Sequence, residues 1–144
     1  MSKSYLYQLY NKELGKKVLV DKIEENKYRI LEFGIFKPIL NGGFLVNNSI
    51  VRIFQKYVPE QIQTVREVII WRKSTNETWT NYSEIELKNH LDLETYKNVE
   101  LDGYKIYNLY NDIICVSSLL KDKLISEYEN LDELEFNNDW PCYG

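Results

Sequence analysis

The sequence predicts a single α+β domain, in which a mainly antiparallel, twisted sheet carries a C-terminal amphipathic helix packed on one face. Three observations lead to this prediction. Short β-type runs dominate the chain up to residue 117, one helical stripe follows them, and 144 residues fit one domain spanning 1–144. A chain of this length buries about two-thirds of its unfolded surface, so a single core suffices. Aromatic residues form 14% of the chain, which argues against a disordered composition.

The first half of the chain contains strand patterns and one helical pattern. The segment around residues 50–57 could form a strand or a helix. Its apolar side chains fit helical spacing and Pro59 ends it, so a helix is slightly favoured. The Asn-Gly-Gly run at 41–43 predicts a turn, because glycine adopts positive φ at little cost. The apolar or alternating runs that predict strands are residues 4–10, 16–22 and 27–34.

The middle of the chain predicts a central strand followed by a loop. Residues 64–73 are rich in β-branched side chains and nearly apolar on both faces, which is typical of a strand inside a sheet. Residues 74–83 are polar and predict a loop that carries Trp79. Residues 83–98 fit either a helix or a strand. Two further strands, joined by an Asn-Asp hairpin, are residues 104–110 and 112–117.

An amphipathic helix over residues 118–130 closes the predicted fold. Ser117 or Ser118 can cap it, because a serine oxygen accepts a backbone N–H that lacks a partner in the first helical turn. The serines lack the flanking glycines of a nucleophile elbow, so we expect a structural role for them. The residues of the apolar stripe are Leu120, Leu124, Ile125 and Tyr128.

Charge is divided unevenly along the chain. Residues 1–83 contain 13 Lys/Arg and 8 Asp/Glu, whereas residues 84–144 contain 5 Lys/Arg and 14 Asp/Glu. Two interpretations stay open: the second half has more solvated surface, or it forms an acidic face that meets a basic partner. The first half has no extended basic stripe, so we expect no binding of nucleic acid.

Few residues suggest catalysis or metal binding. His90, the only histidine, is either a structural residue between leucines or an acid–base catalyst with Asp92 or Glu94. Cys115 lies in an apolar run and is expected to be a buried, reduced thiol, whereas Cys142 near the C-terminus is expected to be exposed. One histidine and two distant cysteines do not supply a zinc site. We therefore expect no metal and no cofactor.

The sequence contains no membrane or secretory signal. No run approaches the roughly 20 apolar residues of a membrane helix, and the first residues lack an uninterrupted apolar core. We therefore expect a cytoplasmic protein. Residues 4–10 are expected to form an exposed edge strand that can pair between chains, so a monomer and a homodimer both stay open.

Two kinds of residue are candidates for binding a partner. The carboxylates clustered at 132–135 do not have EF-hand spacing, so they form either a solvated rim or a partner-facing acidic patch. Tryptophans in polar or terminal segments are candidate interface anchors. The complete candidate set is Trp79, Asp132, Glu133, Glu135, Asp139 and Trp140.

Residues 102–136 have a distinctive order of elements. A hydrophobic strand ends in Val116-Ser117, a helix follows with Leu-Lys-x-x-Leu-Ile at 120–125, and a short strand contains Leu134 and Phe136. This pattern resembles the closing segment of bacterial polymorphic-toxin immunity proteins, specifically the immunity 43 and immunity 11 type families.

The resemblance implies a small, non-catalytic cytosolic protein of bacteria. Such a protein binds one cognate toxin domain, covers its active site and protects the cell in interbacterial competition. The 12 tyrosines suit this role, since tyrosine gives large, rigid contacts at low entropic cost. Two alternatives stay open: a general protein-interaction module of mobile-element origin, and a small enzyme that uses His90.

Overall fold

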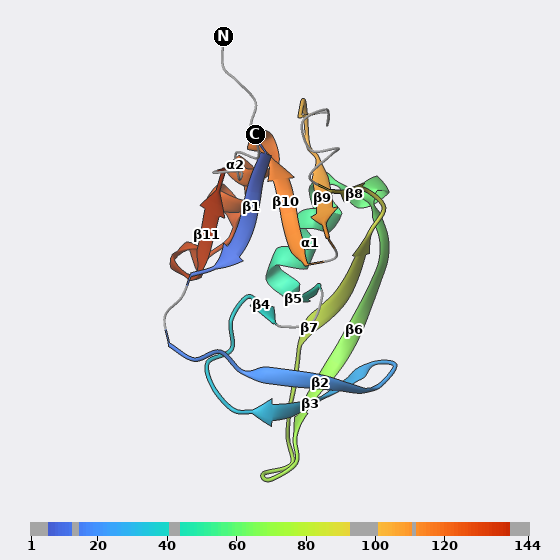
Figure 1. Cartoon of the computed structure of the whole chain (residues 1–144), viewed down its shortest axis with the longest axis vertical. Coiled ribbons are helices and arrows are strands. Elements are labelled where there is room, and N and C mark those ends of the chain that lie inside the picture. Colours follow the sequence, from blue (N-terminus) through green and yellow to red (C-terminus); the bar gives the residue numbers. More distant parts are fainter. Residues whose placement is uncertain (1–5, 13–14, 41–43, 93–100, 111, 139–144) are drawn as a thin grey trace.

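The computed structural model describes residues 6–12, 15–40, 44–92, 101–110 and 112–138, and the fold is α+β with two sheets and two helices (Figure 1). The first sheet has the order β11-β1-β10-β9-β8: Leu134–Asn137, Leu6–Asn11, Ile113–Ser117, Ile106–Leu109 and His90–Leu91. The second has the order β2-β3-β6-β7-β5-β4: Leu19–Glu24, Lys27–Glu32, Ile62–Arg72, Glu77–Leu87, Leu45–Asn47 and Ile39–Leu40. The helices are α1 (Asn48–Tyr57) and α2 (Ser118–Glu127), and 3₁₀ turns cover Pro59–Gln61 and Leu131–Glu133.

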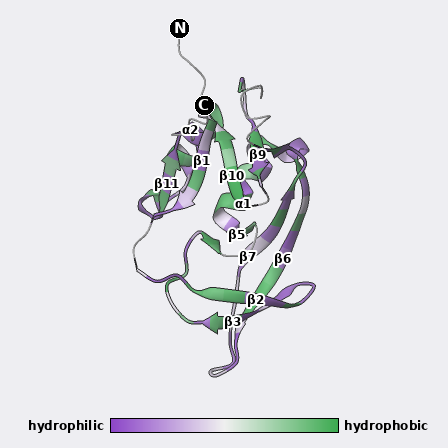
Figure 2. Cartoon of the chain, viewed as in Figure 1, coloured by the Kyte–Doolittle hydropathy of each residue, from purple (hydrophilic) through white to green (hydrophobic). Residues whose placement is uncertain are grey.

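Most strand pairs are antiparallel, as the sequence predicted, and β3–β6 and β8–β9 are the parallel pairs among the described strands. The single sheet that we expected is divided into two. Three clusters of buried apolar residues form among the described residues, and the smallest, which includes Cys115, lies among β1, β8, β9 and β10. Of the other two, the larger core joins the first sheet to both helices, with Phe54, Ile106 and Leu120 fully buried. The smaller core lies on one face of the second sheet and includes Val68 and Ile70. Figure 2 shows apolar residues along β9 and β10, whose side chains are almost all buried.

Neither α1 nor α2 is long and apolar enough to cross a membrane.

The structure corrects two predictions about strands. Residues 4–10 were expected to form an exposed edge, but β1 lies between β10 and β11, so it is an interior strand and offers no edge to a second chain. Residues 74–83 were expected to form a loop, but only residues 73–76 form the turn and Trp79 lies within β7. The polar side chains misled the prediction because both faces of β7 are largely solvated over residues 77–81, and local composition alone does not distinguish such a strand from a loop.

The helix predicted at 50–57 is confirmed as α1. Asn47 caps it, since its Oδ1 accepts a hydrogen bond of 3.0 Å from the Ile50 amide. The helix ends before Pro59, which cannot continue an α-helix. Its buried residues are Ile50, Val51, Ile53 and Phe54, which belong to the larger core.

The C-terminal helix is shorter and its apolar stripe narrower than expected. α2 ends at Glu127, and Leu120 and Leu124 are fully buried, whereas Ile125 is 42% exposed. Ser117 occupies the cap position but its side chain does not cap the helix. Its Oγ instead donates to the Gly103 carbonyl (2.8 Å) and accepts from the Lys105 amide (2.9 Å). The buried serine therefore ties the start of α2 to the segment that precedes β9.

We expect Ser117→Ala to lower the free energy of unfolding by about 1–3 kcal/mol, because the buried hydroxyl loses its hydrogen bonds to both the Gly103 carbonyl and the Lys105 amide. Urea denaturation followed by circular dichroism measures this change. Ser126→Ala, on the exposed side of α2, is the matched control and should change stability by less than about 0.5 kcal/mol. Equal effects of the two substitutions would contradict the assigned role of Ser117.

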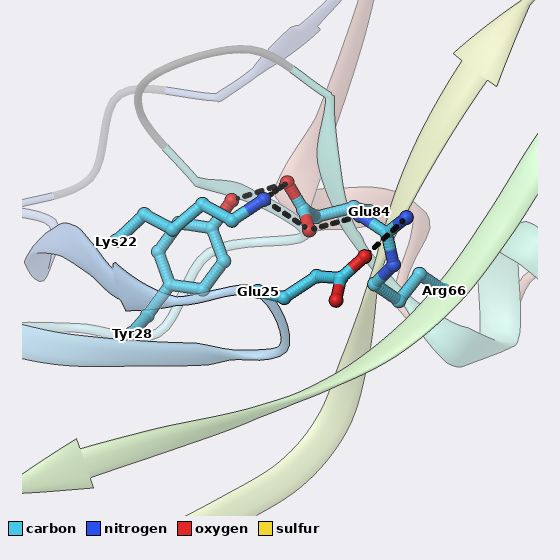
Figure 3. A network of polar contacts seen from close by, with 5 residues as sticks. All are labelled: Lys22, Glu25, Tyr28, Arg66 and Glu84. Carbon is cyan, nitrogen blue, oxygen red and sulfur yellow. Dashed lines mark hydrogen bonds and ion pairs between the residues drawn. The ribbon is translucent and has the colours of Figure 1, made fainter.

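A polar network joins the β2–β3 hairpin to the β6–β7 hairpin (Figure 3). The carboxylate of Glu84 accepts hydrogen bonds from Lys22 Nζ (3.0 and 3.1 Å) and from the Tyr28 hydroxyl (2.7 Å). Arg66 lies 3.5 Å from the same carboxylate and 3.4 Å from Glu25. Burial by itself would raise the pKa of Glu84, but the hydrogen bonds from Tyr28 and Lys22 outweigh it and hold the pKa below its usual value.

Glu84→Gln should lower the free energy of unfolding by about 1–2 kcal/mol at neutral pH, because the charge-assisted hydrogen bonds are lost. Since folding lowers the pKa of Glu84, its contribution is present above the ordinary pKa of 4.5 and is lost as the pH falls through the folded value. The gap between wild type and variant should therefore close below about pH 4.5 in thermal melts. The control is Glu86→Gln, an exposed position of β7. A gap independent of pH would exclude the network as its source.

Candidate partner-binding surface

Three aromatic rings meet where β7 passes the segment that follows β3. The ring centroid of Trp79 lies 4.8 Å from that of Phe36 and 6.1 Å from that of Phe33. The guanidinium of Arg72 lies 3.9 Å from the Phe33 centroid. Phe33 is 45% exposed and Trp79 is half-buried. This aromatic cluster (Phe33, Phe36 and Trp79) therefore presents apolar surface and a cation together, a combination enriched at the energetic centres of protein interfaces.

A polar groove of about 380 Å³ begins at Phe36 and runs between β7, the start of α1 and the turn before β11. Thr80 and Asn81 of the groove lie in a β-bulge of β7. Val68 pairs with Tyr82 and Ile70 with Trp79, so two residues of β7 lie opposite the single residue between Val68 and Ile70 of β6. We call this hollow the amide groove. Its lining residues are Phe36, Lys37, Pro38, Asn47, Asn48, Ser49, Arg52, Thr80, Asn81, Tyr82, Asn130 and Glu133. A second hollow of about 260 Å³ shares Ser49, Arg52 and Asn130 with it.

Hydrogen bonds hold the walls of the groove in place. Asn47 Nδ2 donates to the Tyr128 hydroxyl (2.9 Å), and Ser83 Oγ donates to Asn48 Oδ1 (2.6 Å). The Tyr82 hydroxyl donates to the Lys37 carbonyl (2.6 Å). Burial, with a smaller effect of the Glu133 charge, raises the pKa of Tyr82, so this phenol stays neutral. These groups bind one another and so fix the shape of the groove, whose lining also includes the charged residues Lys37, Arg52 and Glu133.

The structure separates the sequence-predicted site residues into three groups. Glu133 lines the amide groove, and Trp79 contacts its Phe36 wall, so these two lie on one surface. Asp132 is exposed on the 3₁₀ turn and Glu135 is exposed on the edge strand β11; neither is among the residues that line the groove. Asp139 and Trp140 lie outside the described residues.

Sequence reasoning missed the residues that build most of the groove. Asn47 and Asn48 come directly before the helical pattern at 50–57, and this position is the signal of a helix cap. No local pattern indicates that β7 and Glu133 lie beside them. These contacts join segments more than 30 residues apart.

The residues considered for catalysis or metal binding, His90 and Cys115, lie outside the groove. His90 is exposed on β8 and lines neither hollow. Cys115 is fully buried, as expected, and burial raises its pKa to about 12, which keeps the thiol protonated. Among the described residues, no group of three or more His, Cys, Asp and Glu side chains is placed to hold a metal ion. What the surface offers is therefore hydrogen bonding and apolar contact.

In comparisons with known proteins, no family model, curated protein or solved structure matches the chain.

Asn47→Ala should lower the free energy of unfolding by about 1–2 kcal/mol, since both the helix cap and the bond to Tyr128 are lost. Asn47→Asp keeps an acceptor for the cap but loses the amide donor, so its effect should be smaller. The exposed Asn81→Ala is the control and should change stability by less than about 0.5 kcal/mol. Thermal unfolding measured by calorimetry checks this order, and an Asp variant less stable than the Ala variant would contradict it.

Proposed function

We propose that the protein is an immunity-type inhibitor that binds a cognate bacterial toxin domain and covers its active site. The exposed aromatic cluster beside the amide groove carries this proposal. Rings of this size dominate binding energy at interfaces when a partner removes them from water. The groove then supplies polar and charged side chains, among them Asn81, Arg52 and Glu133, for a segment of the toxin.

The chain as a whole supports the same proposal. The order of elements in residues 102–136 resembles that of the immunity 43 and immunity 11 type families. We propose that α2 packs as an amphipathic helix on one face of the first sheet and so holds Glu133 at the groove. A cytoplasmic location in bacteria, where the toxin would otherwise act, belongs to the proposal. Tight binding needs no catalytic residue of the inhibitor, because occupying the toxin's active site suffices.

The test is co-expression with the toxin domain encoded beside this chain in its genome. Wild type should restore growth of a sensitive host and bind the purified toxin in titration calorimetry. Trp79→Ala and Glu133→Lys should each weaken binding about tenfold or more, since they remove an anchor and reverse a charge of the surface. Circular dichroism establishes that both variants fold.

His90→Ala is the control and should bind and protect like wild type, because His90 lies on β8 away from the groove. Loss of protection in this variant, with the fold retained, would favour a small enzyme instead. Protection unchanged by Trp79→Ala and Glu133→Lys would exclude the proposed surface. Binding to a non-toxic partner alone would favour a general interaction module.

A further inference from the structure

A notch opens where β3 separates from the β6–β7 hairpin. The two strands pair in parallel only from Lys27 with Ile69 to Arg29 with Trp71. Beyond that point β3 stays with β2, while β6 continues into the turn of the hairpin, whose tip extends past β3 (Figure 1). The space between them is a hollow of about 560 Å³. The residues of this notch are Ile30, Leu31, Phe33, Arg72, Lys73 and Ser74.

Exposed apolar side chains gather at this notch. Leu31, Phe33 and Ile35 occupy alternate positions and are 59%, 45% and 48% exposed. Leu31 and Phe33 line the same hollow together with Ile30, and Ile35 continues their strip. Single exposed apolar residues are common on proteins, but a contiguous group marks a surface that a partner covers.

The notch also carries positive charge. Arg72 stacks on Phe33, and its ion pair with Glu77 is long, at 3.9 Å. Lys73 is exposed in the turn next to it. An exposed ion pair at that distance contributes little free energy, so the side chains of Arg72 and Lys73 can both pair with carboxylates of a partner. A partner that fits both features has apolar side chains and negative charge.

The aromatic rings of this region favour a polypeptide over a nucleic acid. Bases stack on free ring faces. Here the Arg72 guanidinium covers a face of Phe33, and Lys27 Nζ lies 4.7 Å from the Trp71 ring centroid. The Trp71 indole is held in place by a hydrogen bond of 2.9 Å to Asn76. What remains exposed is mainly aliphatic, which suits Leu-, Ile- or Phe-like side chains of a protein.

We propose that the notch binds an acidic, apolar polypeptide segment of the partner. A large apolar side chain of that segment enters between Leu31 and Phe33, and a neighbouring carboxylate pairs with Arg72 and Lys73. This inference rests on the proposed function: the partner is the toxin, and the notch is one of the places where the toxin contacts the protein. It reverses the expectation from overall charge, which points to a basic partner, because the exposed apolar residues of the notch lie in the basic half of the chain.

The experiment is selection of a displayed library of random short peptides on the immobilised full chain. Enriched peptides should combine Asp or Glu with Leu, Ile, Phe or Trp. In fluorescence polarisation their affinity should fall about tenfold or more for Lys73→Glu and for Leu31→Asp, and it should weaken as salt rises. Both positions are exposed, so the variants should fold. Lys88→Glu, the same charge change at an exposed position beyond β7, is the matched control and should bind like wild type.

Several outcomes overturn the inference. Enrichment of peptides without carboxylates, or no enrichment, excludes an acidic segment as the ligand. Equal losses in Lys73→Glu and Lys88→Glu exclude the notch as the site. Binding of a fluorescent poly-thymidine strand that is lost in Lys73→Glu and Leu31→Asp would assign the surface to nucleic acid instead.

The two proposals fail in different ways. Toxin protection that persists in Leu31→Asp and Lys73→Glu excludes the notch as the toxin contact but leaves the inhibitor function standing. Specific acidic peptides from the selection, together with no protection against the neighbouring toxin, retain the notch as a polypeptide site and exclude the immunity function.

Discussion

Glu84 lies on β7 between a residue of the larger core and a residue of the smaller core. Tyr82 belongs to the smaller core and Ile85 to the larger one. Lys22 and Tyr28 bind this carboxylate from the crossing hairpin, whereas backbone pairing between β3 and β6 covers only three residue pairs. Charge-assisted hydrogen bonds are stronger than neutral ones, so this network and the buried packing of Val20 and Tyr28 against β6 and β7 together fix the direction in which β2–β3 crosses β6–β7.

The candidate binding surface depends on that crossing. Phe33 and Phe36 follow β3, and they meet Trp79 only because the β2–β3 hairpin lies across β7. The divergence of β3 from β6 opens the notch on one side of the cluster. The bulge at Thr80 and Asn81 opens the amide groove on the other. The crossing of the hairpins and the bulge together place the aromatic cluster between the notch, which is apolar and cationic, and the polar groove.

Charge on this surface differs from charge along the sequence. The groove lining combines Glu133 with Lys37 and Arg52, while the notch presents Arg72 and Lys73. Apolar rings supply most of the affinity at an interface, and charges mainly orient the partner and select it. A partner whose carboxylates meet the notch and whose charges complement the mixed lining of the groove would therefore dock in one orientation. The overall balance of the chain does not describe such a surface.

The sequence by itself determined the elements whose pattern is local. The helical spacing at 50–57, the β-branched run of β6, the buried Cys115 and the α+β class all follow from periodicity and composition. Only the tertiary structure decided that β1 is interior, that Trp79 lies in a strand and that Glu133 faces the start of α1. Periodicity reports which face of an element is apolar, but it carries no information on which distant segment covers that face. Strand pairing, the bulge and the buried bonds of Ser117 depend on such distant partners, and the binding surface is built from them.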